Sequence, residues 1–183
     1  MNSRRTRHRN PLVAAAAVLA LLVVMPVAPA SAATPAPESA QVSSGAALLT
    51  ADLDGRPIEL VKVGSYYCHD FDYPRIHCFA TPAALEDAVS TTLVAMAATD
   101  TNYVLIFENT YYQGAYMYIS SDYSILATVG WNDRISSFKS VNSGSGKFWT
   151  DWFYGGTSWG FCCNVQTPFL GTFNDTFSSV YRT

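Results

Sequence analysis

The chain repeats a short sequence after a fixed interval of 42 residues. NDRISS begins at Asn132 and NDTFSS begins at Asn174, and the same interval separates Gly114 from Gly156 without insertion or deletion. An internal repeat of this period predicts two copies of one supersecondary unit. Because one copy alone would leave an apolar face in water, we expect the two copies to pack against each other.

The repeat also predicts the secondary structure of each copy. The first copy is expected to span residues 103–141 and the second residues 145–183. Each has room for about four short strands, since strands commonly have ~5–6 residues. In each copy an aromatic residue, Phe107 or Trp149, precedes the glycine by seven positions. We expect the aromatic residue to pack at the corner of a hairpin, and the glycine to adopt a positive φ there.

The combined pattern is an aromatic residue, six further residues, a glycine and later N/D-N/D-x-x-S/T-S. It resembles the Greek-key motif of the βγ-crystallin superfamily, in the calcium-binding form found in microbial proteins. The resemblance covers residues 102–183, and both copies match every position of the motif. It implies a mainly β fold, in which two Greek-key motifs form a βγ-crystallin-like sandwich with two calcium sites at one end.

The resemblance also implies which residues hold the calcium ions. Each site would join the hexapeptide of one motif to the first hairpin of the other. The first site is expected to comprise Asn132, Asp133, Arg134, Ser136 and Thr150. The second is expected to comprise Asn174, Asp175, Thr176, Ser178 and Glu108. Their carboxylate, amide, hydroxyl and backbone oxygens are the donors that Ca²⁺ prefers. The alternative is that NDxxSS only builds a turn, as Asn, Asp and Ser commonly do.

The first 32 residues have the features of a secretory signal peptide. They contain the four arginines Arg4, Arg5, Arg7 and Arg9, then an apolar run from Leu12 to Val27, and end in Ala30-Ser31-Ala32. We therefore expect a secreted protein with no membrane span after cleavage. Removing this segment leaves seven basic and 14 acidic residues, a net charge of −7. An acidic chain gains nothing from counterion release on nucleic acid, so no nucleic-acid partner is expected.

Between the signal and the repeats we expect a linker and a small extension. Residues 33–50 are rich in Ala, Pro, Ser and Thr, which predicts a disordered linker. Residues 51–100 are expected to form a hairpin around Asp54-Gly55, a compact loop from Cys68 to Cys78, and a helix. The helix is predicted from Thr81 as N-cap and Pro82 at the first position. Its packed face is expected to comprise Leu85, Val89, Leu93 and Met96.

The four cysteines, all in the exported part, predict disulfides but not their pairing. Cys162 and Cys163 are neighbours, so one possibility is that they clamp the Cys68/Cys78 segment onto the repeats. The other is a local Cys68–Cys78 bridge with the neighbours left over. A zinc site made from Cys68-His69 and His77-Cys78 is a weaker alternative.

No catalytic signature is present in the sequence. It contains no G-x-S-x-G, no H-E-x-x-H and no P-loop, and only His69 and His77 remain after signal removal. We therefore expect a non-catalytic protein. The alternative function is a secreted proteinase inhibitor of crystallin fold, since crystallin-fold proteins exported by actinobacteria include metalloproteinase inhibitors. Its partner would be an extracellular protease. A cytotoxic crystallin-fold protein is a third hypothesis.

Overall fold

The computed structural model describes residues 48–95 and 102–183. The expected signal peptide, the linker up to residue 47 and Met96 lie outside these residues. The two repeats form seven strands: β5 (Tyr103–Asn109), β6 (Gln113–Ile119), β7 (Ser137–Val141), β8 (Gly146–Trp149), β9 (Ser158–Phe161), β10 (Gln166–Thr167) and β11 (Ser179–Arg182). Short 3₁₀ turns connect them: η2 (Thr110–Tyr112), η3 (Leu126–Val129), η4 (Trp152–Tyr154) and η5 (Gly171–Phe173).

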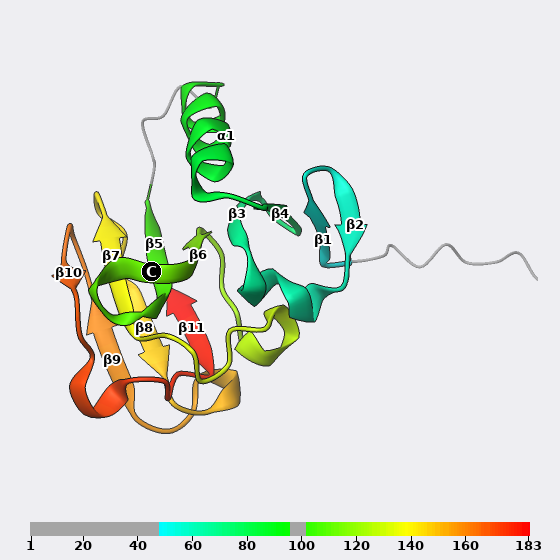
Figure 1. Ribbon diagram of the computed structural model, residues 1–183. Helices are drawn as coiled ribbons and strands as arrows, with labels where there is room; N and C mark the ends of the chain where they lie inside the picture. The colour runs from blue at the N-terminus through cyan, green and yellow to red at the C-terminus, as the bar shows by residue number, and fades with distance from the viewer. Residues whose placement is uncertain (1–47, 96–101) are drawn as a thin grey trace, which may run out of the picture. The chain divides into compact units, whose positions relative to one another are not determined.

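The two repeats exchange strands, so that each sheet contains segments of both. β10 of the second repeat pairs with β7 of the first, and Tyr123 of the first repeat bridges to Val180 in β11 of the second. The larger sheet therefore contains the order β10-β7-β5-β6, and the smaller sheet has the order β11-β8-β9 (Figure 1). This arrangement is the expected pair of Greek-key motifs.

The core between the sheets is aromatic. Its largest fully buried side chains include Trp131, Phe138, Phe148 and Phe177. The rings of Phe148 and Phe177 lie 5.1 Å apart, as do those of Phe138 and Phe148, within the range in which aromatic pairs stabilise a core beyond their buried area. Because these residues come from both repeats, neither repeat completes this core alone.

The extension is part of the larger sheet. It forms β1 (Thr50–Leu53), β2 (Arg56–Ile58), η1 (Leu60–Ser65), β3 (Tyr67–Asp72), β4 (Arg75–Phe79) and α1 (Pro82–Ala95). β3 pairs in parallel with β6, which gives one eight-stranded sheet of order β10-β7-β5-β6-β3-β4-β1-β2 (Figure 1). The hairpin around Asp54-Gly55 is confirmed, but the expected Cys68–Cys78 loop is wrong, because this segment forms the β3–β4 hairpin.

Helix α1 covers the outer face of the larger sheet. Thr81 accepts a hydrogen bond from the backbone N–H of Ala84 at 3.3 Å, as a helix N-cap does. The buried Leu85 and Val89 pack with Leu105, Phe107 and Tyr118 of the sheet. The hydroxyls of Tyr116 and Tyr118 both donate to Glu86, at 2.7 and 2.8 Å.

The structure contains the local Cys68–Cys78 bridge that was one of the two expected pairings, and a second bridge in addition. Cys68 and Cys78 are direct partners in the β3–β4 register, and their sulfurs are bonded beneath the sheet surface. Because both sulfurs are in a disulfide, they are not free to act as the thiolate ligands of the alternative zinc site. Cys162 and Cys163, exposed after β9, are bonded to each other rather than left over.

Candidate functional site: two interlocked polar loops

The two hexapeptides adopt the same backbone shape. Each follows a 3₁₀ turn and leads into the last strand of its repeat. Asp133 and Asp175 have positive φ values of 53° and 55°. The amide of the preceding asparagine, Asn132 or Asn174, donates to the aspartate Oδ2 at 2.7 Å in both copies. The other carboxylate oxygen of each aspartate, Oδ1, has a different partner.

That partner comes from the opposite loop. The Ser136 hydroxyl donates to Asp175 Oδ1 at 2.7 Å, and the Ser178 hydroxyl donates to Asp133 Oδ1 at 3.3 Å. Backbone bonds tie the loops together, from the Asp133 N–H to the Phe177 carbonyl at 3.0 Å and from the Asp175 N–H to the Ile135 carbonyl at 3.1 Å. The expected grouping of each aspartate with the serine of its own hexapeptide is therefore corrected by the strand exchange.

Each aspartate–serine pair lies at the end of one first-hairpin strand. The Ser136 N–H donates to the Phe107 carbonyl at 3.0 Å, next to Glu108, and the Ser178 N–H donates to the Trp149 carbonyl at 2.8 Å, next to Thr150. The structure thus forms two groups of residues. Group A comprises Glu108, Arg134, Ser136, Asn174 and Asp175. Group B comprises Asn132, Asp133, Thr150, Thr176 and Ser178.

The last serine of each hexapeptide has a different task. Ser137 donates to the Asn109 carbonyl at 2.7 Å and accepts from the Tyr112 N–H at 3.0 Å. Ser179 makes the same two bonds, to the Asp151 carbonyl and from the Tyr154 N–H. These serines fix the folded corners η2 and η4. Sequence reasoning missed this role, although the repetition of the serine in both copies was a signal for it.

The glycines after the corners support the same geometry. Gly114 and Gly156 have φ values of 78° and 73°, as expected from the sequence. The aromatic residue of the first corner is also confirmed, because the ring of Phe107 lies 5.5 Å from that of Tyr112.

Group A contains an ion pair that group B lacks. Arg134 Nη2 donates to Glu108 Oε1 at 2.6 Å, and Nη1 donates to the Gly130 carbonyl at 2.8 Å. The hydrogen bond from Arg134 holds the pKa of the Glu108 carboxyl below its usual range, against the opposing effect of burial. The equivalent positions in group B are the neutral Thr150 and Thr176, whose hydroxyls bond to nearby backbone atoms.

The two asparagines also differ. Asn132 Oδ1 accepts a hydrogen bond from the indole Nε1 of Trp152 at 2.9 Å. Asn174 Oδ1 is buried and has no hydrogen-bond partner, because Thr110 occupies the position equivalent to Trp152. Buried polar atoms are normally satisfied, so the unpaired oxygen is consistent with a ligand.

The donor chemistry of both groups fits calcium. Each group offers one paired carboxylate, one serine hydroxyl and neighbouring backbone carbonyls, and Ca²⁺ takes six to eight such oxygens, water included. Over residues 48–95 and 102–183, no group of three or more His, Cys, Asp or Glu is arranged to hold a metal ion. A calcium ion in either group would therefore depend largely on neutral oxygens.

Among known proteins, the chain is similar to several solved structures. No protein-family model matches the chain, and no curated protein matches it. Among solved structures, a βγ-crystallin from Ciona intestinalis is 26% identical, with 44% of this chain and 99% of that chain covered and a TM-score of 0.41. An archaeal βγ-crystallin is 21% identical over 46% and 100% of the two chains, with a TM-score of 0.41. A double mutant of a βγ-crystallin domain from Clostridium beijerinckii is 27% identical over 44% and 94%, with a TM-score of 0.39.

The two repeats form a βγ-crystallin-like domain. Strand exchange between them and their paired folded corners are the features on which this rests. In the described part of the chain, no helix is long and apolar enough to cross a membrane.

The extension joins this crystallin-like domain through a buried carboxylate that sequence reasoning missed. Asp70 of β3 is fully buried and accepts hydrogen bonds from the N–H groups of Ser120 and Ser121 and from the hydroxyl of Tyr123. Burial raises the pKa of Asp70, and these bonds oppose the rise. Its position two residues after Cys68 was a signal that the side chain shares the buried face of β3.

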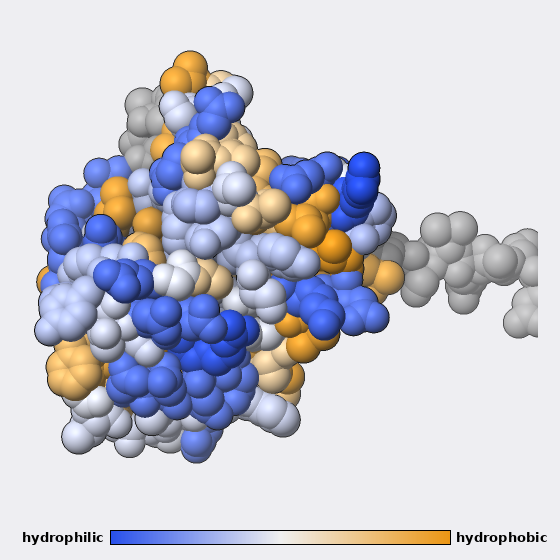
Figure 2. Space-filling view, in the orientation of Figure 1, coloured by the Kyte–Doolittle hydropathy of each residue, from blue (hydrophilic) through white to orange (hydrophobic). Residues whose placement is uncertain are grey.

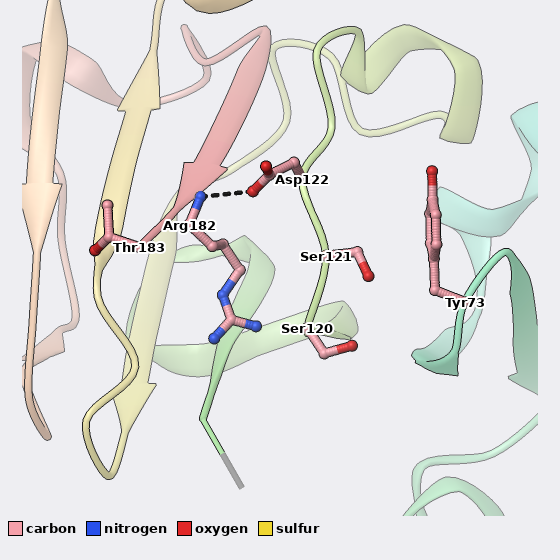
Figure 3. A pocket seen from close by; sticks show the side chains of 6 residues that line it. All are labelled: Tyr73, Ser120, Ser121, Asp122, Arg182 and Thr183. Atoms are coloured by element: carbon pink, nitrogen blue, oxygen red, sulfur yellow. Dashed lines mark hydrogen bonds between the residues drawn. The ribbon is translucent and has the colours of Figure 1, made fainter. Parts of the chain in front are cut away.

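Beside this joint lies a polar hollow of about 490 Å³. Figure 3 shows its lining side chains, which are Tyr73, Ser120, Ser121, Asp122, Arg182 and Thr183. The Arg182 N–H donates to Asp122 Oδ1 at 2.7 Å. Figure 2 shows a broad hydrophilic area over the region where Figure 1 draws β8 and β11. The guanidinium of Arg182 donates to the Ile119 and Asn102 carbonyls, so the polar groups of the hollow are already engaged within the protein and it is a weaker candidate than the two loops.

Proposed function

We propose that this protein is a secreted, non-catalytic calcium-binding protein whose crystallin-like domain is stabilised by two calcium ions. The observation that carries the proposal is the reciprocal contact of Asp133 with Ser178 and of Asp175 with Ser136. Each contact brings a carboxylate and a hydroxyl from different repeats to one point. An ion bound there would connect the two repeats.

The proposed effect on stability follows from linkage. A ligand that binds the folded state alone raises the free energy of unfolding by RT ln(1 + [L]/Kd). In the unfolded chain the aspartate and the serine of each group are 39 residues apart in group A and 45 in group B, so the oxygen cluster does not exist there. In group B, Asp133 and Ser178 would both bind the ion, with the Thr176 and Thr150 carbonyls as candidate ligands. Group A would use Asp175, Ser136, Asn174 and the carbonyls of Arg134 and Glu108.

Export is the second part of the proposal. It rests on the arginine-led apolar segment at the start of the sequence and on the two disulfides, which persist in oxidising compartments. Extracellular calcium sites function even with Kd values of ~10⁻⁴–10⁻³ M. Sequencing the N-terminus of the protein recovered from the medium tests this part, with residue 33 expected first.

The calcium proposal is tested by calorimetric titration of the chelator-stripped exported protein, together with thermal melting. We expect two ions per chain and a higher melting temperature with calcium. The double variant Asp133→Ala/Asp175→Ala should lose both effects. Asp87→Ala, which removes an exposed carboxylate from α1, should keep both. If the parent protein shows neither binding heat nor stabilisation, the calcium proposal is wrong, and inhibition of a secreted metalloproteinase becomes the next assay.

A further inference from the structure

We propose that the Arg134–Glu108 ion pair sets the calcium affinity of group A and leaves that of group B unchanged. The inference rests on the proposed function and concerns how the two sites differ. The hexapeptides have the same pattern and backbone shape, so this difference has to come from the variable third position, Arg134 or Thr176, and from the residues around the loops.

The guanidinium of Arg134 is fixed on three sides. It donates to Glu108 Oε1 at 2.6 Å and to the Gly130 carbonyl at 2.8 Å, and it lies 5.7 Å from the centre of the buried Trp131 ring. The extension supports this arrangement, because a Cβ built at Gly64 of η1 would come within 2.7 Å of Arg134 Nη1. The cation is therefore held in place.

The same ion pair occupies the carboxylate of Glu108. One carboxylate oxygen is bonded to Arg134, and the other accepts the Ala115 N–H at 3.3 Å. Without Arg134, a carboxylate would stand uncompensated one residue after Phe107, whose carbonyl bonds Ser136 of group A. Calcium readily adds a carboxylate oxygen to its ligands. By pairing with Glu108, Arg134 thus prevents the negative charge of that carboxylate from contributing to calcium binding.

The charges of Glu108 and Arg134 are close enough to group A to change its calcium affinity. Glu108 is one residue from the Phe107 carbonyl that contacts Ser136, which places its backbone within ~8 Å of the group A hydroxyl. The backbone of Arg134 also follows Asp133 of group B, but its guanidinium is bonded to Glu108 and so lies on the side of group A. At a separation of ~8 Å one unit charge changes the affinity for a divalent ion by about sixfold even at the dielectric constant of bulk water, so a change of about tenfold is a conservative expectation near a protein surface. The equivalent positions of group B, Thr150 and Thr176, are neutral, so the chain contains its own reference site.

The inference predicts effects of opposite sign for the two partners. Arg134→Thr, which copies Thr176, should tighten calcium binding at group A by about tenfold. Glu108→Thr, which copies Thr150, leaves the cation unpaired and should weaken binding by a similar factor. The double variant should return close to the parent affinity, and Arg134→Lys should retain it. A role confined to folding would weaken binding in both single variants.

The experiment measures one site at a time with calcium chloride as the titrant, in the exported protein. An Asp133→Ala background removes a carboxylate of group B, so that group A is titrated alone. An Asp175→Ala background isolates group B, where Arg134→Thr should change the dissociation constant by less than about twofold. Melting of each variant without calcium confirms that it is folded.

The outcomes separate this inference from the proposed function. A parent protein with no calcium binding overturns both. Two sites in the parent, together with an Arg134→Thr variant that binds no tighter at group A, overturn the ion-pair inference alone. Equal changes at both groups also overturn it, because the effect would then be a general one of net charge.

Discussion

The Asp133 carboxylate accepts a hydrogen bond from the hydroxyl of Ser178, which lies 45 residues further along the chain, at 3.3 Å. Its counterpart joins Asp175 to Ser136 at 2.7 Å. The repeats are therefore interlocked at their polar loops as well as through their exchanged strands. Substitutions in one repeat are expected to affect the binding group that the other repeat shares.

This interlocking predicts which substitutions act together. Asp133→Ala and Ser178→Ala should each impair the same calcium site, so their combination should cost little more binding free energy than Asp133→Ala alone. Asp133→Ala and Ser136→Ala affect different sites, and their effects should add. Calorimetric titration of the single and double variants measures both cycles. Additivity within the first pair would show that the two residues do not share an ion.

The two serines of one hexapeptide should behave differently. Ser137→Ala leaves the Asn109 carbonyl and the Tyr112 N–H without their partner, and should lower the free energy of unfolding by about 2 kcal/mol even without calcium. Ser136→Ala should matter mainly when calcium is present. Urea unfolding with chelator and with calcium distinguishes them. Equal losses for both variants in chelator would contradict these assignments.

The buried carboxylate of Asp70 should be needed to hold the extension. Asp70→Ala removes the acceptor for two backbone N–H groups and the Tyr123 hydroxyl, so we expect a loss of about 3 kcal/mol or more in unfolding free energy. The matched control is Asp122→Ala, whose exposed carboxylate accepts one backbone hydrogen bond from Arg182 and should cost less than about 1 kcal/mol. Chemical denaturation measures both, and similar losses would argue against Asp70 as the joint.

His69 should make stability depend on pH. Burial lowers the pKa of His69 to about 4 from 6.5, with a smaller lowering from His77 and opposing effects from Asp52 and Asp72. The unfolded chain takes up a proton near pH 6.5, but the folded chain does so only near pH 4. The contribution of His69 is therefore complete above pH 6.5, and about 2–3 kcal/mol is lost as pH falls to 4. Urea unfolding across this range should show a smaller slope for His69→Gln, whereas an unchanged slope would assign the pH dependence to other groups.

The contact between η1 and η3 should tolerate no side chain. A Cβ at Gly64 would overlap the Gly130 carbonyl oxygen, so Gly64→Ala should cost about 2–3 kcal/mol of unfolding free energy. Gly160→Ala is the matched control, because its Cβ would meet only the Gly146 carbonyl oxygen, at 3.9 Å. Thermal melting compares the two, and a small effect at Gly64 would mean that η1 moves readily from this contact.

The repeat predicted the crystallin-like domain well because its signals are local. The positive φ of Gly114 and Gly156 and the position of the polar loops all follow from residues adjacent in sequence. The partner of each serine could not be predicted in this way. Asp133 is compatible with Ser136 and with Ser178 as long as the exchange of strands between the repeats is unknown.

The extension was harder to predict because its main contacts are distant. The parallel pairing of β3 with β6 cannot be predicted from a turn sequence, because β4, α1, β5 and η2 separate the two strands along the chain. Asp70 finds its donors at Ser120, Ser121 and Tyr123, about 50 residues away. Local periodicity could place Asp70 on the buried face, but it could not identify the hydrogen-bond donors that surround its carboxylate.

The parallel pairing of β3 with β6 also removes a strand edge onto which another copy of the chain could add a strand. An uncovered β6 would present unpaired backbone groups along a seven-residue strand, a template onto which a second molecule could add a strand. With β3 in place, this end of the described sheet is instead β2, a three-residue strand with Pro57 at its centre and Arg56 beside it. The other end is the two-residue β10. Both borders are poor templates for aggregation, so this sheet is not expected to join edge to edge with that of another copy.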